Sequence, residues 1–310
     1  MYAIEIQNLS KSYQVGFWKK GLRPALKNLS LCVERGETFG FLGPNGAGKT
    51  TTLKLLMGIT FPSSGTAKIL GRHFQDPEIK KKIGFLPEQP YFYDYLSAPE
   101  LLDYYGRLSG VSAEERQRKI PATLESVGLN DAGNTQLRKF SKGMLQRVGI
   151  AQAIIHDREI LFLDEPMSGL DPLGRHEVRE LIQKLKDAGK TIFFSTHILS
   201  DAEALCDRVA VIHKGQLRGI GVMNELRSAA GTNSEIIWQG ANALSAVVRD
   251  VTEPHVTGEL VRATVAREQQ DRVLEKLRQQ GAVLISVTPL HGTLEEYFLA
   301  KTSQAEAVQP

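Results

Sequence analysis

The stretch from Gly43 to Thr50, GPNGAGKT, matches the pattern G-x-x-x-x-G-K-[ST] at every fixed position. Glycines let a backbone approach a ligand closely, so that successive N–H groups converge on phosphate oxygens at the start of a helix. In this pattern Lys49 reaches the β- and γ-phosphates, and the Thr50 hydroxyl coordinates Mg²⁺. The sequence therefore predicts a nucleotide phosphate site, formed by Gly43, Pro44, Asn45, Gly46, Ala47, Gly48, Lys49, Thr50 and Thr51.

A second candidate for chemistry is the acidic pair at the end of the apolar run in EILFLDEP, residues 159–166. Such a run is typical of a buried parallel strand that presents carboxylates at its C-terminal end, where ligands of open α/β sheets bind. There Asp164 would hold Mg²⁺, and Glu165 would act as the general base for an attacking water. The alternative is a pair of solvated turn acids, which the phosphate loop in the same chain disfavours.

These residues need a scaffold of alternating strands and helices. GETFGFL before the loop reads as a buried strand, and TTLKLLMGI after it reads as a helix. Strands are also predicted at 159–164 and 190–196, with an amphipathic helix between them that ends at Gly189. Apolar residues spaced by three and four predict helices between about 95 and 158. The alternation predicts a parallel sheet core.

Length and composition restrict the possible classes of protein. A chain of 310 residues with 42% hydrophobic residues can build a large domain and a small one. The net charge of +3 gives no strong field for nucleic acid. Cys32 and Cys206 lack metal-ligand spacing and fit buried thiols in a reducing compartment. No run of about 18 apolar residues predicts a membrane span, and the N-terminus does not resemble a signal peptide.

Residues from about 222 onward form a separate pattern. NSEIIWQG, GELVRATVA, REQQDRVLEKLRQQG and AVLISVTPL read as strand, strand, helix and strand, a small α+β unit. GTLEEYFLA, at 292–300, reads as a closing helix before a frayed tail.

Further motifs occur in a fixed order around the phosphate loop and the acidic pair, and together they resemble the ATP-binding subunit of an ABC transporter. The resemblance covers most of residues 1–220. FSKGMLQR at 140–147 is similar to the signature sequence of the family, SGLD to its D-loop and FSTH to its switch region.

The resemblance implies roles for six more residues. Tyr13 would stack on adenine, Gln89 would contact Mg²⁺ or the attacking water, and His197 would contact the γ-phosphate. The same resemblance implies that the signature residues Ser141 and Gly143, with Asp171 of the D-loop, bind nucleotide. The signature would complete the site of a partner subunit.

The signature departs from the usual family form at two positions. Lys142 replaces a glycine, and Met144 replaces a glutamine. Ser141 and the N–H groups at the start of the following helix are the atoms that a phosphate needs, and both are kept.

The resemblance also implies a fold and a domain plan. We expect an α/β fold of the P-loop NTPase type, an ABC cassette with a mixed sheet core and a helical subdomain, followed by a small C-terminal α+β domain. The cassette would span residues 1–221, with its helical subdomain at about 90–158, and an accessory or regulatory domain would span 222–310.

The implied function is the hydrolysis of ATP, with Mg²⁺, to power a separate integral-membrane permease. The subunit would act as a homodimer on the cytoplasmic face of the cell membrane, without nucleic acid. LEEYFLA near the C-terminus resembles the drug-, antibiotic- and polysaccharide-export branch (ABC-2 type), which favours export.

The alternative function is a soluble ABC-type ATPase that acts on ribosomes or nucleic acid. The ribosomal type carries two cassettes per chain, whereas this sequence has one phosphate loop and one signature. A DNA-repair ATPase needs a long coiled coil between the two motifs, and residues 52–139 show no sustained heptads.

For each of two aromatic stretches, the sequence is compatible with two structural interpretations. Phe17 and Trp18, beside Lys19 and Lys20, either meet a membrane surface or partner, or fold back on their own sheet. The tyrosine-rich residues 90–106 either dock the membrane partner or pack the helical region.

Overall fold

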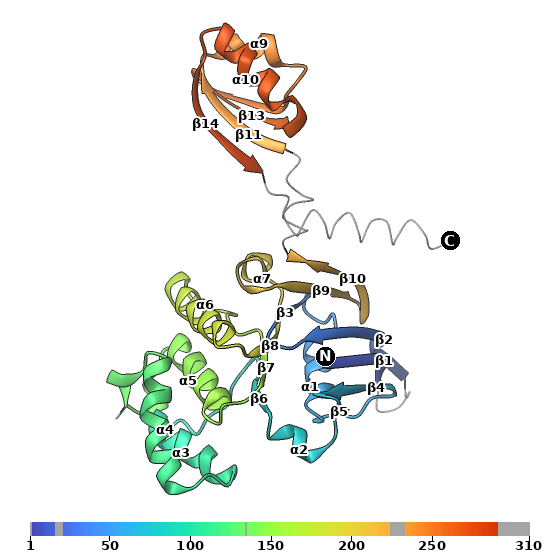
Figure 1. Ribbon diagram of the computed structural model, residues 1–310, viewed down its shortest axis with the longest axis vertical. Helices are drawn as coiled ribbons and strands as arrows, with labels where there is room; N and C mark the ends of the chain where they lie inside the picture. Colours follow the sequence, from blue (N-terminus) through green and yellow to red (C-terminus); the bar gives the residue numbers. More distant parts are fainter. Residues whose placement is uncertain (1, 16–20, 134, 224–232, 291–310) are drawn as a thin grey trace. The chain divides into compact units, whose positions relative to one another are not determined.

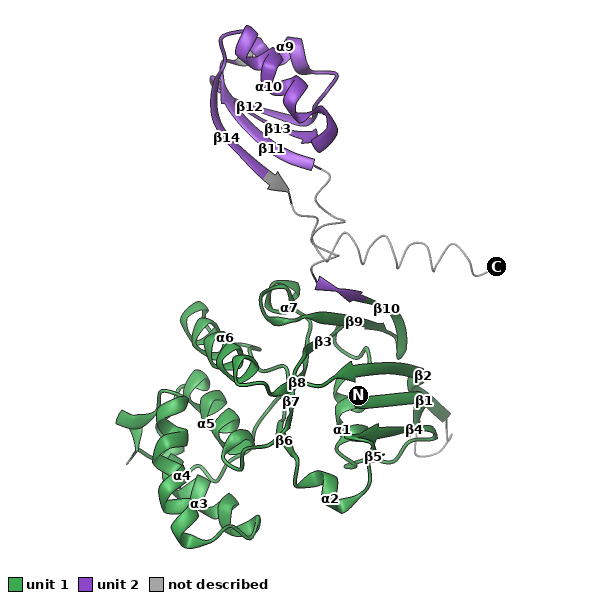
Figure 2. Ribbon diagram, viewed as in Figure 1, with its two compact units in different colours: residues 1–220 green, residues 221–310 purple. Residues whose placement is uncertain are grey.

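The computed structural model describes residues 2–15, 21–133, 135–223 and 233–290. The chain divides into two compact units, Met1–Ile220 and Gly221–Pro310 (Figure 2). The loop with Phe17 and Trp18 and the predicted closing helix at 292–300 lie outside the described residues.

The first unit contains two sheets (Figure 1). The antiparallel sheet has the strand order β2-β1-β4-β5, with β1 (Tyr2–Val15), β2 (Gly21–Glu34), β4 (Ser64–Ile69) and β5 (Arg72–His73). The second sheet has the order β10-β9-β3-β8-β7-β6. Its strands are β3 (Thr38–Leu42), β6 (Ile83–Leu86), β7 (Ile160–Asp164), β8 (Thr191–Thr196), β9 (Arg208–His213) and β10 (Gln216–Val222).

Strands β9, β3, β8, β7 and β6 pair in parallel. Every residue of β3, β7 and β8 is buried, as expected for continuous apolar runs covered on both faces. The register places Leu42 opposite Thr196, and Asp164 opposite Ser195. The carboxyl ends of β3, β8 and β7 therefore lie at one edge of the sheet.

Seven helices of the first unit are described. They are α1 (Lys49–Leu56), α2 (Pro77–Lys80), α3 (Ala98–Leu108), α4 (Ala113–Ser126), α5 (Lys142–Ile154), α6 (Pro172–Asp187) and α7 (Leu199–Leu205), with short 3₁₀ turns η1 (Asn130–Ala132) and η2 (Leu137–Lys139). Helices α3, α4 and α5 gather into one helical region (Figure 1). Several begin at caps visible in the sequence: the Ser112 hydroxyl accepts the Glu115 N–H of α4 at 3.2 Å.

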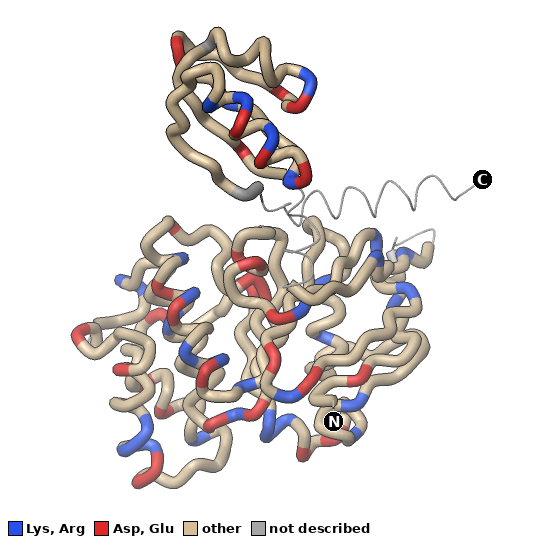
Figure 3. The backbone as a smooth tube through the Cα atoms, turned by 45° about the horizontal axis from the view of Figure 1, so that its top comes forward, with Lys and Arg blue, Asp and Glu red and all other residues tan. Residues whose placement is uncertain are grey.

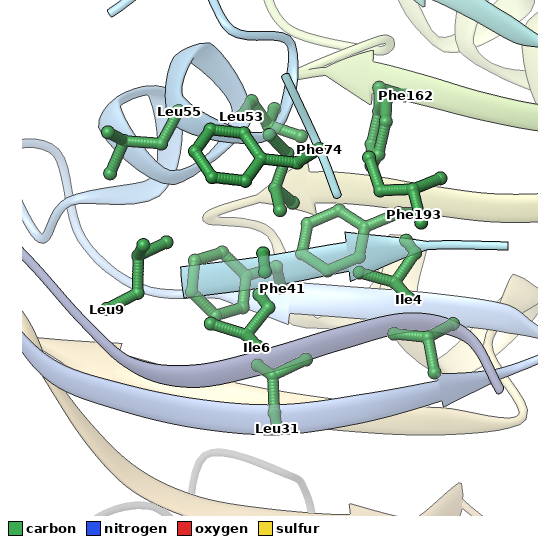
Figure 4. Close-up of a cluster of buried hydrophobic side chains, with 14 of the residues drawn as sticks. Ile4, Ile6, Leu9, Leu31, Phe41, Leu53, Leu55, Phe74, Phe162 and Phe193 are labelled. Atoms are coloured by element: carbon green, nitrogen blue, oxygen red, sulfur yellow. The ribbon is translucent and has the colours of Figure 1, made fainter. Parts of the chain in front are cut away.

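The main core of the first unit joins its two sheets to α1. Ile4, Ile6 and Leu9 from β1 meet Phe41 and Phe193 from the parallel sheet (Figure 4). The rings of Phe41 and Phe193 have centroids 5.4 Å apart. This packing fixes α1, and with it the phosphate loop, against the sheet.

The second unit has one antiparallel sheet, ordered β12-β13-β11-β14, and its own buried core around Trp238. Its elements are β11 (Asn233–Gln239), η3 (Ala241–Ala243), α9 (Leu244–Val247), β12 (Thr252–Thr257), β13 (Leu260–Ala266), η4 (Arg267–Gln269), α10 (Gln270–Gln279) and β14 (Val283–Leu290). The sequence pattern missed α9 and β12. Every residue of β12 is exposed and the strand contains Pro254, so this edge strand shows no buried alternation.

Surface charge and hydropathy agree with the composition. Lys and Arg are interspersed with Asp and Glu along the chain (Figure 3). None of the helices in the described ranges is long and apolar enough to cross a membrane. Both cysteines are free thiols, with Cys206 buried and Cys32 only partly buried.

The separate cores predict that damage to the second unit leaves nucleotide binding intact. Trp238→Ala removes a fully buried side chain and should cost that unit about 3–5 kcal/mol of stability. Scanning calorimetry should show a lowered transition for one unit, while a nucleotide titration keeps wild-type affinity. Val283→Ala, on a side chain 60% exposed, is the control and should change stability by less than about 0.5 kcal/mol. Loss of nucleotide binding in Trp238→Ala would contradict the prediction.

Candidate active site

The phosphate loop connects β3 to α1 in a conformation that requires glycine. Gly48 has φ of 113°, and a Cβ there would lie 2.7 Å from the Ala25 carbonyl oxygen. A Cβ on Gly43 would lie 2.3 Å from the Ile212 carbonyl oxygen. Both contacts are with backbone, which cannot move aside cheaply, so neither glycine can carry a side chain without distortion of the loop.

The loop curls around the ammonium group of Lys49, the first residue of α1. Lys49 Nζ donates hydrogen bonds to the carbonyl oxygens of Gly43 at 2.6 Å and Pro44 at 3.3 Å. The N–H of Ala47 donates to the same Pro44 oxygen at 3.1 Å. Lys49 is 5% exposed, so its charge is almost fully removed from water.

Glu165 is the anionic partner of Lys49. Its Oε1 lies 3.0 Å from Lys49 Nζ, and its side chain is also 5% exposed. Its Oε2 lies 2.8 Å from His197 Nδ1. The phosphate loop, the end of β7 and the end of β8 thus meet in one cluster of a lysine, a carboxylate and an imidazole.

Asp164 lies beside this cluster as the last residue of β7. Ser195 Oγ donates to Asp164 Oδ1 at 2.5 Å. Burial raises the pKa of the Asp164 carboxyl above its ordinary value, and hydrogen bonds from the Ser195 and Thr50 hydroxyls oppose the rise. Thr50 and Asp164, two of the predicted metal ligands, are therefore neighbours.

These two side chains fit a hard cation. A hydroxyl and a carboxylate oxygen are ligands that Mg²⁺ accepts, with waters and phosphate oxygens completing its shell. No group of three His, Cys, Asp or Glu side chains in the described part of the chain could hold a metal. The third predicted ligand, Gln89, is exposed.

A cavity of about 380 Å³ opens over the phosphate loop. It is lined by Ala25, Asn45, Gly46, Gly48, Lys49, Thr50, Thr51, Glu88 and Glu165. The structure thus brings the loop residues and the proposed base together. Sequence reasoning missed Ala25 and Glu88; Glu88, rather than the adjacent Gln89, forms the wall. A larger cavity of about 610 Å³ in the second unit contains none of the predicted site residues.

The remaining predicted residues lie elsewhere in the first unit and do not line this cavity. Tyr13 is 38% exposed on β1, with Lys11 Nζ 5.1 Å from its ring centroid. Ser141 caps α5 and accepts the Met144 N–H at 3.2 Å.

Asp171 caps α6 in the same way, accepting the Gly174 N–H at 2.8 Å. A Cβ on Gly143 would lie 3.8 Å from Gly174 Cα, so the starts of α5 and α6 are in close contact. The signature and the D-loop therefore form one surface of the chain, separate from the cavity over Lys49.

Comparison with known proteins agrees with this geometry. The sequence profile of the ABC transporter family matches residues 26–168. An uncharacterised ABC transporter ATP-binding protein of Synechocystis is 45% identical over 96% of this chain and 83% of its own length. The bacitracin transport ATP-binding protein of Bacillus licheniformis is 36% identical over 96% of both chains. A Nod factor export ATP-binding protein of Cupriavidus pinatubonensis is 37% identical over 72% of this chain and 67% of its own.

A solved structure confirms the predicted fold class. A dimeric ATP-binding cassette in a post-hydrolysis state, bound to ADP and Pi, superimposes with a TM-score of 0.65. It is 27% identical and covers 71% of this chain and 98% of its own. The chain therefore belongs to the ABC transporter family and is one of its ATP-binding, ATP-hydrolysing subunits.

Proposed function

We propose that this subunit hydrolyses ATP in a homodimer that powers a separate membrane permease, in the direction of export. The observation that carries the proposal is the buried ion pair of Lys49 and Glu165 in the lining of the phosphate cavity, with the more exposed His197 in contact with Glu165. The cluster contains a phosphate-binding cation, a carboxylate base and a partner that orients that base, which are the groups that the hydrolysis of a phosphoanhydride needs.

In the proposed reaction the β- and γ-phosphates replace Glu165 as the partner of Lys49. The released carboxylate accepts a proton from water as the water oxygen bonds to the γ-phosphorus and the bridging P–O bond breaks, which yields ADP and phosphate. His197, at 2.8 Å from Glu165 Oε2, holds the carboxylate on the side of the γ-phosphate. Thr50 and Asp164 would hold Mg²⁺, which neutralises charge on the phosphates.

The separate position of Ser141 and Asp171 supports a shared site. In one chain the signature and the D-loop do not line the cavity over Lys49, so they are free to meet a second subunit. We propose that Ser141 and Gly143 of each subunit, with Asp171, face the ATP of the other. Tyr13, on an exposed part of β1, would stack on adenine.

A groove beside the helical region supports the permease as partner. It has a volume of about 360 Å³ and is lined by Met57, Ile83, Gly84, Phe85, Pro87, Tyr105, Ser109, Gln152, Ala153, His156 and Arg158. Next to it, Tyr93 and Tyr104 stack edge to face at 5.5 Å, while Tyr91 is 93% exposed. Exposed aromatics of this kind are enriched in interface cores. We propose that a cytoplasmic helix of the permease binds here, which places the subunit at the cytoplasmic face of the membrane.

The proposal also includes a direction of transport and a role for the second unit. The bacitracin and Nod factor relatives are named for transport and export, respectively. Both names favour transport over action on ribosomes or nucleic acid, and the Nod factor name favours export. We assign the second unit, which has its own core, an accessory or regulatory role. Co-purification with a permease encoded beside this gene, followed by ATP-driven transport in vesicles, tests the partner and the direction together.

The role of Glu165 predicts a variant that binds ATP without turnover. Glu165→Gln should lower the rate of hydrolysis by about 10²–10⁴, since general-base catalysis contributes that much. ATP affinity should persist, and the ATP-bound dimer should accumulate in size-exclusion chromatography. Glu159→Gln is the control and should keep wild-type turnover, because Glu159 lies just before the other end of the same strand, where it is partly exposed and paired with Lys82. Undiminished hydrolysis by Glu165→Gln would remove Glu165 from the mechanism.

The role of Lys49 predicts failure at an earlier step. Lys49→Ala removes the cation that faces the phosphates and leaves Glu165 buried without its partner, so calorimetric titration should show greatly weakened ATP binding. Wild-type affinity for ATP in this variant would contradict the assignment.

The shared site predicts that two inactive variants restore activity when mixed. Ser141→Arg should bind ATP as a monomer yet block hydrolysis, because the bulky cation would lie across the interface. A heterodimer of Ser141→Arg with Lys49→Ala has one site with both defects and one with neither, so some activity should return. Ser112→Arg is the control, since it removes the equivalent cap of α4 and should stay active. A flat mixing curve, with heterodimers present, would exclude the shared site.

A further inference from the structure

Ser195 makes two hydrogen bonds to the two acidic residues at the end of β7. Its hydroxyl donates to Asp164 Oδ1 at 2.5 Å and accepts the backbone N–H of Glu165 at 3.1 Å. The side chain is fully buried, and the parallel register of β7 and β8 places it directly opposite Asp164. The contacts therefore come from the sheet itself and are shielded from water.

The bond to Glu165 supports an unusual backbone conformation. Glu165 has φ of 49°, in the left-handed region that residues other than glycine rarely adopt. Its N–H donates to two acceptors of Ser195, the Oγ at 3.1 Å and the carbonyl oxygen at 3.2 Å. Such a conformation persists only where the surrounding structure holds it. From this turn the side chain reaches Lys49 and His197.

The bond to Asp164 restrains the carboxylate on the other side. Asp164 accepts a hydrogen bond from Ser195 on β8, and the Thr50 hydroxyl on α1 is its neighbour on the other side. Its carboxyl group is thus fixed between the sheet and the phosphate loop. To bond both Asp164 and the Glu165 N–H, one side-chain atom must be a donor and an acceptor at once. In a position of this size, the hydroxyl of Ser195 meets that need.

We infer that Ser195 is a positioning residue for hydrolysis: its hydroxyl fixes the turn that directs Glu165 toward Lys49 and His197, and it orients Asp164 beside Thr50. The inference rests on the proposed role of Glu165 as the base. Ser195 does not touch the substrate; it acts through its two neighbours on β7.

The first test separates the rate of hydrolysis from the binding of ATP. Ser195→Ala removes both bonds and leaves the Glu165 turn without its side-chain acceptor, so kcat should fall roughly 5- to 100-fold. The KM and the affinity for ATP should change less than about twofold, because the phosphate loop and Lys49 are unaltered. Ser195→Thr, which keeps the hydroxyl, should recover most of the lost rate.

The matched control lies on the same strand. Thr191, at the other end of β8, is also buried, and its hydroxyl accepts the Gly36 N–H at 2.9 Å. Thr191→Val removes a similar hydrogen bond far from the cluster, so it should lower stability comparably and leave kcat unchanged. An equal fall in kcat for Thr191→Val would show a general effect of sheet stability and overturn the inference.

The second test asks whether Ser195 acts through Glu165. In the Glu165→Gln background the base is already lost, so only the effect through Asp164 remains, and adding Ser195→Ala should lower the residual rate by a smaller factor than it lowers the wild-type rate. A full and additive loss in the double variant would overturn the inference. Wild-type turnover by Glu165→Gln would overturn the proposed role of Glu165 as the base, on which this inference rests. Wild-type turnover by Ser195→Ala beside an inactive Glu165→Gln would overturn the positioning role alone. If Ser195→Ala does not fold, Ser195→Cys replaces it. The thiol is of similar size but a weaker donor, so kcat should again fall while KM changes little.

Discussion

The parallel pairing of β3, β8 and β7 sets the position of every group that acts at the strand ends. Because the three strands run in the same direction, the phosphate loop, His197 and Glu165 all leave the sheet at one edge. The register is strict because each of these strands is buried along its whole length. A shift of one residue would move Ser195 away from Asp164 and turn the acidic side chains to the opposite face.

The ion pair between Lys49 and Glu165 is the main electrostatic feature that this edge creates. Both side chains are 5% exposed, and burial of either charge alone would cost several kcal/mol. The ion pair therefore allows the cation and the carboxylate to be buried together, because each charge offsets the other. In the proposed reaction a phosphate takes the place of the carboxylate, so Lys49 keeps an anionic partner while Glu165 becomes available for a proton. This exchange would link the start of catalysis to the arrival of ATP.

Helix packing also brings together the signature and the D-loop, which are proposed to contact the ATP of a second subunit. The starts of α5 and α6 are neighbours, since a Cβ on Gly143 would lie in van der Waals contact with Gly174. Ser141 and Asp171 cap these two helices through their own hydrogen bonds. The signature and the D-loop therefore lie side by side at the starts of two neighbouring helices.

The sequence by itself determined the local features of this protein. The phosphate loop, the buried strands and the acidic pair are visible because each depends on neighbouring residues: glycine where the loop turns tightly, apolar runs where a strand is covered on both faces. The membership of the ABC family followed from the order of these motifs. Tertiary structure decided what depends on residues distant in the chain. It paired Ser195 with Asp164 across two strands, lined the cavity with Glu88, and formed the exposed edge strand β12. A sequence pattern records burial and turn chemistry along one segment, whereas these contacts arise only when packing fixes the register between segments.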